Sequence, residues 1–181
     1  MNSMIRKWLF LLLIVVAVIA LDQITKNLVI THLRLGESYQ LIPALAPFFQ
    51  ITRSENTGAA FGFLNQAGDL FLVVALVVVA IMLVFYPRIP DRAWLTRFGL
   101  GLVVGGALGN AFDRVTHGAV VDFIHYQLPN IVSNVSNLAD HAIVIGVLII
   151  VAESWRSDAA KDRAQAEAEA STEDSGSENH S

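Results

Sequence analysis

The chain has 181 residues, of which 54% are hydrophobic and 15% charged, with a mean hydropathy of +0.54 and a formal net charge of −4. So few charges cannot cover a water-soluble domain of this hydrophobicity, and the composition therefore favours a membrane protein. The absence of cysteine excludes disulfides, zinc–thiolate sites and thiol nucleophiles, and the charge pattern contains no basic footprint for nucleic acid.

Four apolar segments are long enough to cross a membrane, since about 20 mostly apolar residues span a hydrocarbon core roughly 30 Å thick. We predict membrane-spanning helices at residues 5–25, 70–86, 93–112 and 138–154. The third contains closely spaced glycines, namely Gly99, Gly101, Gly105, Gly106 and Gly109. Because glycines at such spacing let helix backbones approach closely, this helix should be the packed centre of a four-helix bundle.

Lysine and arginine residues predict the direction of the spans. They precede the first span, surround the connection between the second and third, and follow the fourth: Arg6, Lys7, Arg88, Arg92, Arg97 and Arg156. By the positive-inside rule both termini are then cytoplasmic, and the longer connections, residues 27–69 and 113–137, face outward. The first span also has features of a cleaved signal peptide, but the polar residues Asp22 and Lys26 just beyond the possible cleavage site favour its retention.

The segments outside the spans differ in character. Alternating apolar and polar residues at 49–53 predict short strands in the first outer connection. Residues 157–181 hold two basic and seven acidic side chains and little apolar surface, so we expect a disordered cytoplasmic tail. The chain thus divides into a membrane domain, residues 1–156, and this acidic tail.

Two aspartates, Asp122 and Asp140, lie where apolar stretches meet polar sequence. A carboxylate at membrane depth costs about 2.5–3.5 kcal/mol, so such residues usually have partners and a function. Counting about 1.5 Å of helix per residue brings both, together with Asp22 and Asp113, to the outer boundary of the bundle. Two carboxylates held together share a proton, so one can activate water while the other protonates the carbonyl oxygen. This pattern predicts an aspartyl protease that needs no metal or cofactor.

The same residues also have simpler interpretations. Asp140 could complement the dipole of the fourth helix, with Asn137 as its N-cap, and Asp122 could be a solvated loop residue. The nearby histidines are His117, His125 and His141. They leave a zinc site open, although their spacing matches no helical zinc motif and we expect them to be solvated loop residues.

The remaining polar positions near the span ends each have two interpretations. Asp22 and Lys26, four residues apart, form either an anchoring ion pair or a pair that positions loops or substrate. Asn56 either belongs to a turn or holds a peptide main chain. Asn110, inside a span, needs a partner on a neighbouring helix or on a substrate. Arg114 either suits the C-terminus of its helix or contacts a neighbouring carboxylate, a lipid or a backbone carbonyl.

Five segments, in order, resemble the motifs of one known family: DQITK at residues 22–26, NTGAAF at 56–61, GGALGNAFDR at 105–114, GAVVDF at 118–123 and NLAD at 137–140. They are similar to those of the bacterial lipoprotein signal peptidases (signal peptidase II). The resemblance implies an aspartic endopeptidase of the bacterial cytoplasmic membrane that removes signal peptides from diacylglyceryl-modified prolipoproteins. It would cut on the amino side of the lipidated cysteine. The implied fold is that of a mainly α membrane protein: a four-transmembrane-helix bundle with a small extracytoplasmic β-rich cradle and a mobile lid.

By this resemblance the catalytic residues are Asp122 and Asp140, which activate water near the outer face of the membrane. The supporting polar residues around the substrate would be Asp22, Lys26, Asn56, Asn110, Arg114 and Asn137. The family implies no metal or cofactor, and its partners are the prolipoprotein, membrane lipid and globomycin-type inhibitors; we expect a monomer. Two positions depart from the family pattern, because Ser136 stands where an aromatic residue is usual and His141 where a small one is.

Two other classes of function compete with the peptidase. A small transporter or channel subunit would use the paired aspartates as an ion site, and neutralising them would alter flux. A non-catalytic assembly factor would use the glycine-rich third span for helix association, and would tolerate Asp122→Asn but not a bulky residue at Gly105.

Overall fold

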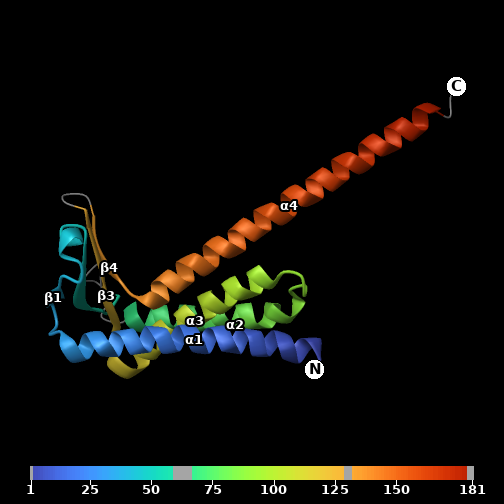
Figure 1. The fold of residues 1–181 in the computed structure, drawn as a ribbon. Coiled ribbons are helices and arrows are strands. Elements are labelled where there is room, and N and C mark those ends of the chain that lie inside the picture. The colour runs from blue at the N-terminus through green and yellow to red at the C-terminus, as the bar shows by residue number, and fades with distance from the viewer. Residues whose placement is uncertain (1, 59–66, 129–131, 179–181) are drawn as a thin grey trace.

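A computed structural model describes residues 2–58, 67–128 and 132–178. Its long helices are α1 (Ser3–His32), α2 (Ala67–Phe85), α3 (Trp94–His117) and α4 (Leu138–Glu178). Each contains a stretch long and apolar enough to cross a membrane, which confirms the predicted four-span helical class. Figure 1 shows α1, α2 and α3 side by side, with a small sheet at the end of the bundle where α1 finishes and α4 starts.

Helix α3 is the centre of the bundle and contacts each of the other three long helices, as its glycines predicted. A Cβ atom on Gly99 would lie 2.8 Å from the carbonyl oxygen of Gly146 in α4, and one on Gly106 would collide with the carbonyl oxygen of Ala139. On the side facing α1, a Cβ on Gly101 would lie 2.8 Å from a side-chain carbon. The glycines therefore bring α1 and α4 against the backbone of α3, and the start of α4 is fixed there.

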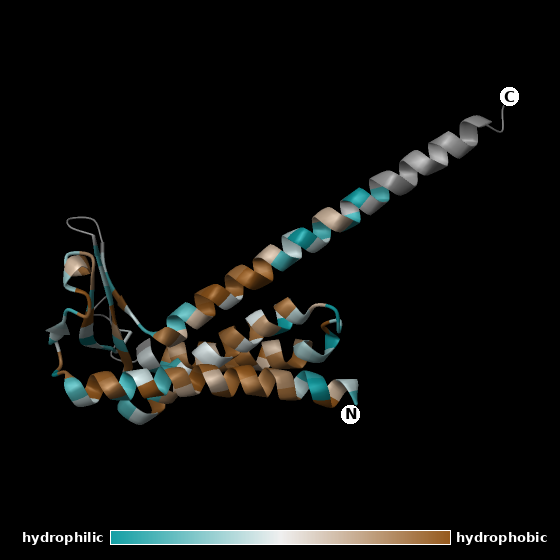
Figure 2. Ribbon diagram, in the orientation of Figure 1, coloured by the Kyte–Doolittle hydropathy of each residue, from teal (hydrophilic) through white to brown (hydrophobic). Residues whose placement is uncertain are grey.

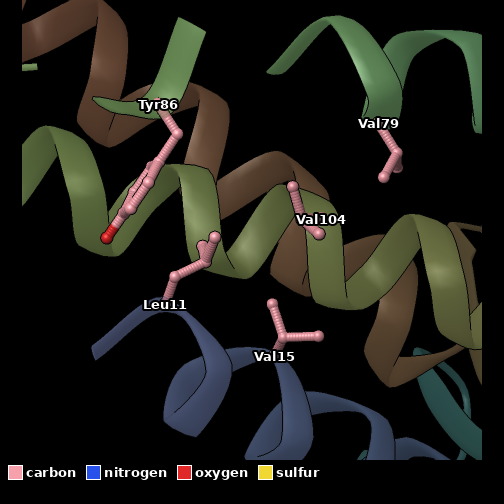
Figure 3. Close-up of a cluster of buried hydrophobic side chains, with 5 residues drawn as sticks. All are labelled: Leu11, Val15, Val79, Tyr86 and Val104. Atoms are coloured by element: carbon pink, nitrogen blue, oxygen red, sulfur yellow. The ribbon is translucent and has the colours of Figure 1, made fainter. Parts of the chain in front are cut away.

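A cluster of buried apolar side chains joins α1, α2 and α3 at the end of the bundle away from the sheet (Figure 3). Leu11 and Val15 of α1 meet Val104 of α3, and Val79 comes from α2. Tyr86, in the short 3₁₀ helix η2 (Tyr86–Arg88) that follows α2, is 1% exposed and donates its hydroxyl to a backbone carbonyl of α1 at 2.8 Å. Close packing of this kind holds helices together in a bilayer, where burial from water contributes little.

The sheet is antiparallel and unites the two longer connections. Its strands, in spatial order, are β1 (Ser38–Tyr39), β2 (Phe49–Asn56), β3 (Val120–Leu128) and β4 (Val132–Ser136). Strand β2 confirms the strand predicted at residues 49–53, and a 3₁₀ helix, η1 (Pro43–Leu45), lies between β1 and β2. In the register of β2 and β3, Ser54 is opposite Asp122. Asp122 lies on β3, which pairs with β4, and β4 ends just before α4 begins.

Two helices continue beyond the apolar stretches from which they were predicted. Helix α1 runs to His32, where Val29 packs under the sheet against Phe123 and Ile124. Helix α4 continues to Glu178, where the composition predicted disorder, and Figure 2 shows its colour changing from brown to teal as it leaves the bundle. Alanine, glutamate, lysine and arginine are good helix formers, so a segment can lack an apolar packing face and still be helical.

Candidate active site

Asp122 is buried on β3 and bonded to two side-chain amides. It is 3% exposed, its Oδ1 accepts from Nδ2 of Asn137 at 2.6 Å, and its Oδ2 accepts from Nδ2 of Asn56 at 3.1 Å. The pKa of Asp122 is raised to about 6, chiefly by burial and in part by the charge of Asp140, against the opposing effects of the two amide donors and the charge of Lys26. The structure thus corrects the interpretation of Asp122 as a solvated loop residue, because this carboxyl group is poised to carry a proton near neutral pH.

Asp140 lies in the first turn of α4 and is only partly buried. Its backbone N–H donates to Oδ1 of Asn137 at 2.9 Å, which confirms Asn137 as the predicted N-cap of this helix. Its side-chain Oδ1 accepts a 2.7 Å hydrogen bond from Nδ2 of Asn110 on α3. The carboxylate is therefore held in place on one side and remains accessible on the other.

Two side-chain amides connect the aspartates. Nδ2 of Asn137, already bonded to Asp122, lies 3.2 Å from Oδ1 of Asn110, and Asn110 donates in turn to Asp140. The same Oδ1 of Asn110 accepts from Nζ of Lys26 at 3.1 Å. Asn110 thus finds the partners that an amide inside a span requires, and the two aspartates share one hydrogen-bonded network.

Behind this network lies a buried cluster of charged side chains. Nζ of Lys26 is 2.7 Å from Oδ2 of Asp22 and 2.7 Å from Oδ2 of Asp113, and none of the three side chains is more than 2% exposed. Gln23 donates to Oδ1 of Asp113 at 2.8 Å. The predicted ion pair of Asp22 and Lys26 is present. Gln23 was not singled out from the sequence, and Asp113 was predicted only to lie near the outer boundary. Both belong to segments that resemble the family motifs, DQITK and GGALGNAFDR.

Asn56 and Arg114 border the aspartates from β2 and α3. Asn56 belongs to the predicted turn, since its Oδ1 accepts from the N–H of Gly58 at 2.9 Å, and its Nδ2 donates to Asp122, a contact that was not predicted. Gly58 has a φ of 77°, which glycine adopts without strain. Arg114 donates to the carbonyl oxygen of Asn110 at 3.3 Å, and its guanidinium lies 5.8 Å from the centre of the Phe71 ring. The rest of the NTGAAF segment, residues 59–61, lies outside the described residues.

The three histidines do not behave alike. His125 is 9% exposed on β3, and its ring hydrogen-bonds to Thr52 at 2.9 Å and to Ser133 at 2.9 Å, so the expectation of a solvated loop residue is wrong for it. His117 is exposed at the end of α3. Among residues 2–58, 67–128 and 132–178, no group of three or more His, Asp and Glu side chains is arranged to hold a metal ion.

The two departures from the family pattern have defined surroundings. His141 bonds through Nδ1 to the carbonyl oxygen of Asn137 at 2.7 Å and through Nε2 to the hydroxyl of Tyr126 at 3.2 Å. The ring of Tyr126 also lies 5.9 Å from that of Phe49, so His141 ties the first turn of α4 to the sheet. Ser136 is buried and its hydroxyl lies 3.5 Å from a β3 carbonyl oxygen. Tyr126 was not singled out in the sequence, because nothing there shows that it meets His141.

Comparisons with known proteins agree with this geometry. A family profile described as signal peptidase (SPase) II matches residues 14–156. The lipoprotein signal peptidase of Geobacillus thermodenitrificans (strain NG80-2) is 43% identical over 138 residues, covering 76% of this chain and 84% of the relative. That of Mesorhizobium japonicum is 42% identical over 155 residues, covering 83% and 90%. A solved structure described as a bacterial membrane enzyme is similar with a TM-score of 0.73 and 31% identity, covering 83% of this chain and 90% of that one. The chain therefore belongs to the signal peptidase II family.

Proposed function

We propose that Asp122 and Asp140 are the catalytic pair with which this chain hydrolyses prolipoproteins. Membership of the family makes the chain an aspartic-type peptidase that removes signal peptides from prolipoproteins. The observation that carries the assignment of the pair is the bonding of Asn137, whose amide donates to Asp122 and whose carbonyl oxygen accepts from the N–H of Asp140. One side chain thus fixes both aspartates, which supports a reaction that needs them together.

The chemistry follows from the unequal burial of the two carboxyl groups. Burial favours the proton on Asp122, so we assign Asp122 as the acid and the more accessible Asp140 as the base. Asp140 accepts a proton from water, whose oxygen attacks the scissile carbonyl carbon, while Asp122 donates its proton to the carbonyl oxygen. When the tetrahedral intermediate collapses, the C–N bond breaks, Asp140 gives the proton that came from water to the leaving amine, and a hydroxyl of the intermediate returns a proton to Asp122 as the carboxyl product forms.

The other predicted site residues divide into two groups, those that border the aspartates and those that lie behind them. Asn56, Asn110, Asn137 and Arg114 border the aspartates, and we propose that their amide and guanidinium groups hold the main chain of the substrate. Asp22 and Lys26, at 0% and 2% exposure, are satisfied by protein partners, which supports a structural role behind the site.

The substrate and its location follow from the position of the site at one end of the bundle. A diacylglyceryl chain on the substrate cysteine stays in the bilayer, so the scissile bond is presented where the spans end. The positive-inside rule supports an outward-facing site with both termini and the acidic tail in the cytoplasm of a bacterial cell. We further propose that the enzyme works as a monomer, that a part of the second outer segment, between the third and fourth spans, serves as a lid, and that globomycin-type peptides inhibit by binding between the aspartates.

The test is cleavage of a diacylglyceryl-modified prolipoprotein by the purified full-length chain, with mass spectrometry of both products. We expect a cut on the amino side of the lipidated cysteine, no cut in the unmodified precursor, and no effect of a chelator. Cleavage that requires added metal would return the histidines as ligands. No cleavage by folded protein would contradict the proposal and favour an ion-transport role for the aspartates.

A further inference from the structure

The buried lysine of α1 contacts two carboxylates that come from different helices. Lys26 lies 2.7 Å from Asp22 on its own helix and 2.7 Å from Asp113 on α3. Removing three charged groups from water carries a large desolvation penalty, which their mutual attraction offsets only with good geometry and further hydrogen bonds. A buried cluster of this kind is therefore weak evidence for stability alone, and the remaining bonds of its carboxylates suggest another use.

Each carboxylate also accepts a hydrogen bond from the backbone N–H of the residue that precedes one of the proposed catalytic aspartates. Oδ1 of Asp22 accepts from the backbone N–H of Ala139 at 3.0 Å, and Ala139 precedes Asp140. Oδ2 of Asp113 accepts from the backbone N–H of Val121 at 3.2 Å, and Val121 precedes Asp122. Both contacts connect Lys26 to a backbone N–H, one in α4 and one in β3, although Asp22 uses its second oxygen for the backbone and Asp113 uses the same Oδ2 that contacts Lys26.

We infer that Lys26 is a positioning residue that sets the separation of the two catalytic aspartates, acting through Asp22 on Asp140 and through Asp113 on Asp122. The inference rests on the catalytic roles proposed above. A third contact supports it, because Nζ of Lys26 also donates to Asn110, the side chain that donates to Asp140. Lys26 is thus connected through hydrogen bonds to the backbone beside Asp122 and to the backbone beside Asp140.

Two consequences distinguish this role from a purely structural one. Loss of positioning lowers kcat much more than it raises KM, because a displacement of about 1 Å in reacting groups costs about 100-fold in rate while the substrate still binds. The positive charge of Lys26 also acts on Asp122, whose carboxyl group faces Asp140, Arg114, Asn56 and Asn137 as well. Removing that charge raises the pKa of Asp122 and, because Asp122 is the proposed acid, moves the alkaline limb of the pH–rate profile to higher pH.

The experiment compares Lys26→Met with Lys7→Met in the full-length protein, using cleavage of the diacylglyceryl-modified prolipoprotein. Lys7 is a matched control on the same helix, 12% exposed, with Nζ 2.8 Å from Asp91 and 2.9 Å from a backbone carbonyl at the other end of the bundle. Thermal unfolding and gel filtration establish that each variant is folded. We expect Lys26→Met to lower kcat about 100-fold with KM changed by less than about threefold, and to shift the alkaline limb of the pH–rate profile to higher pH. Lys7→Met should leave all three unchanged.

A folded Lys26→Met variant with wild-type kcat and an unmoved alkaline limb would overturn the inference. If Lys26→Met does not fold, a comparison of two Asp113 variants tests the inference instead. Asp113→Asn keeps an oxygen that can accept from the N–H of Val121, whereas Asp113→Leu does not. The inference predicts a much lower kcat for Asp113→Leu than for Asp113→Asn at similar KM, and equal kcat values would overturn it. Asp122→Asn, run in parallel, tests the proposed catalytic pair separately, because activity retained in that variant contradicts the pair and not the positioning contacts.

Discussion

The side-chain amide of Asn137 donates a 2.6 Å hydrogen bond to Asp122 while its carbonyl oxygen caps the helix that carries Asp140. An N-cap normally serves only its own helix, where it satisfies one free N–H group of the first turn. Here the same residue also joins the start of α4 to β3. The formation of the helix and the placement of the proposed catalytic pair are therefore linked through one side chain.

The double role of Asn137 can be separated by substitution. Asn137→Ala removes both the cap and the donor to Asp122, so we expect a loss of about 1 kcal/mol in stability together with a fall in kcat of about 100-fold. Asn137→Asp keeps an oxygen for the cap but places a negative charge beside Asp122, so it should lower activity with a smaller loss of stability. Steady-state kinetics and thermal unfolding measure the two effects.

Asn2 provides the matched control for the cap. Its side chain accepts from the N–H of Met4 at 3.2 Å and caps α1 at the other end of the bundle. Asn2→Ala should cost stability without lowering kcat. Equal effects of Asn2→Ala and Asn137→Ala on kcat would contradict the assigned role of Asn137.

The raised pKa of Asp122 predicts that the ionised carboxylate destabilises the folded protein. With a pKa of about 6 in the folded state and an ordinary value of 3.8, the folded state binds the proton more tightly, so stability falls as pH rises through this window. Asp122→Asn should therefore be more stable than wild type at pH 8, by at most about 3 kcal/mol, and the difference should vanish near pH 4. The gain is smaller than this limit because an amide presents only one acceptor oxygen to two donors.

Unfolding midpoints of Asp122→Asn and wild type, recorded in the same detergent from pH 4 to pH 8, test this prediction. Taking the difference at each pH removes the contribution of the other titrating groups. A difference that does not change with pH would show that the pKa of Asp122 is not raised in the folded state.

Local patterns in the sequence were sufficient to predict the four membrane spans and part of the site. Four apolar stretches of sufficient length predicted the spans, the glycines predicted the central position of α3, and Asn137 was predicted as a cap from its spacing to Asp140. Each of these features depends on residues close together along the chain. Contacts between distant segments were not readable in this way.

Three of the missed features depend on such distant contacts. The pairing of β3 with β2 sets Ser54 opposite Asp122, and no periodicity in either segment specifies that register. The contact of Lys26 with Asp113 joins two helices, whereas only the local partner four residues away could be inferred. The burial of His125 follows from its hydrogen bonds to neighbouring strands, which were not predicted.

The close approach of α3 and α4 predicts unequal tolerance of its glycines to alanine. A Cβ on Gly106 would collide with the backbone of Ala139, next to Asp140, whereas one on Gly101 would meet only side-chain atoms of Ile14, with Cγ2 at 2.8 Å and Cβ at 3.0 Å. Gly106→Ala should cost about 1–3 kcal/mol and lower kcat, while Gly101→Ala should cost less and leave kcat unchanged. Unfolding and cleavage measured on both variants provide the test, and a higher kcat for Gly106→Ala than for Gly101→Ala would contradict the packing described.

The contact between Tyr126 and His141 predicts energetic coupling specific to this chain. Their hydroxyl and Nε2 atoms are 3.2 Å apart, and together they connect the sheet to the first turn of α4. In a double-mutant cycle, Tyr126→Phe and His141→Ala should each destabilise modestly and should be non-additive by about 0.5–1.5 kcal/mol. Additive effects on the unfolding free energy would show that the hydrogen bond contributes nothing in the folded protein.

The most direct test of the catalytic pair is the single-turnover rate of prolipoprotein cleavage by wild type, Asp122→Asn and Asp140→Asn, each shown to be folded. Since each aspartate has its own task in moving the proton, the account predicts that either substitution lowers the rate by roughly 10⁴-fold, and that the double variant is little worse than either single one. Cleavage within about tenfold of wild type by either single variant would contradict the assignment of Asp122 and Asp140 as the catalytic pair.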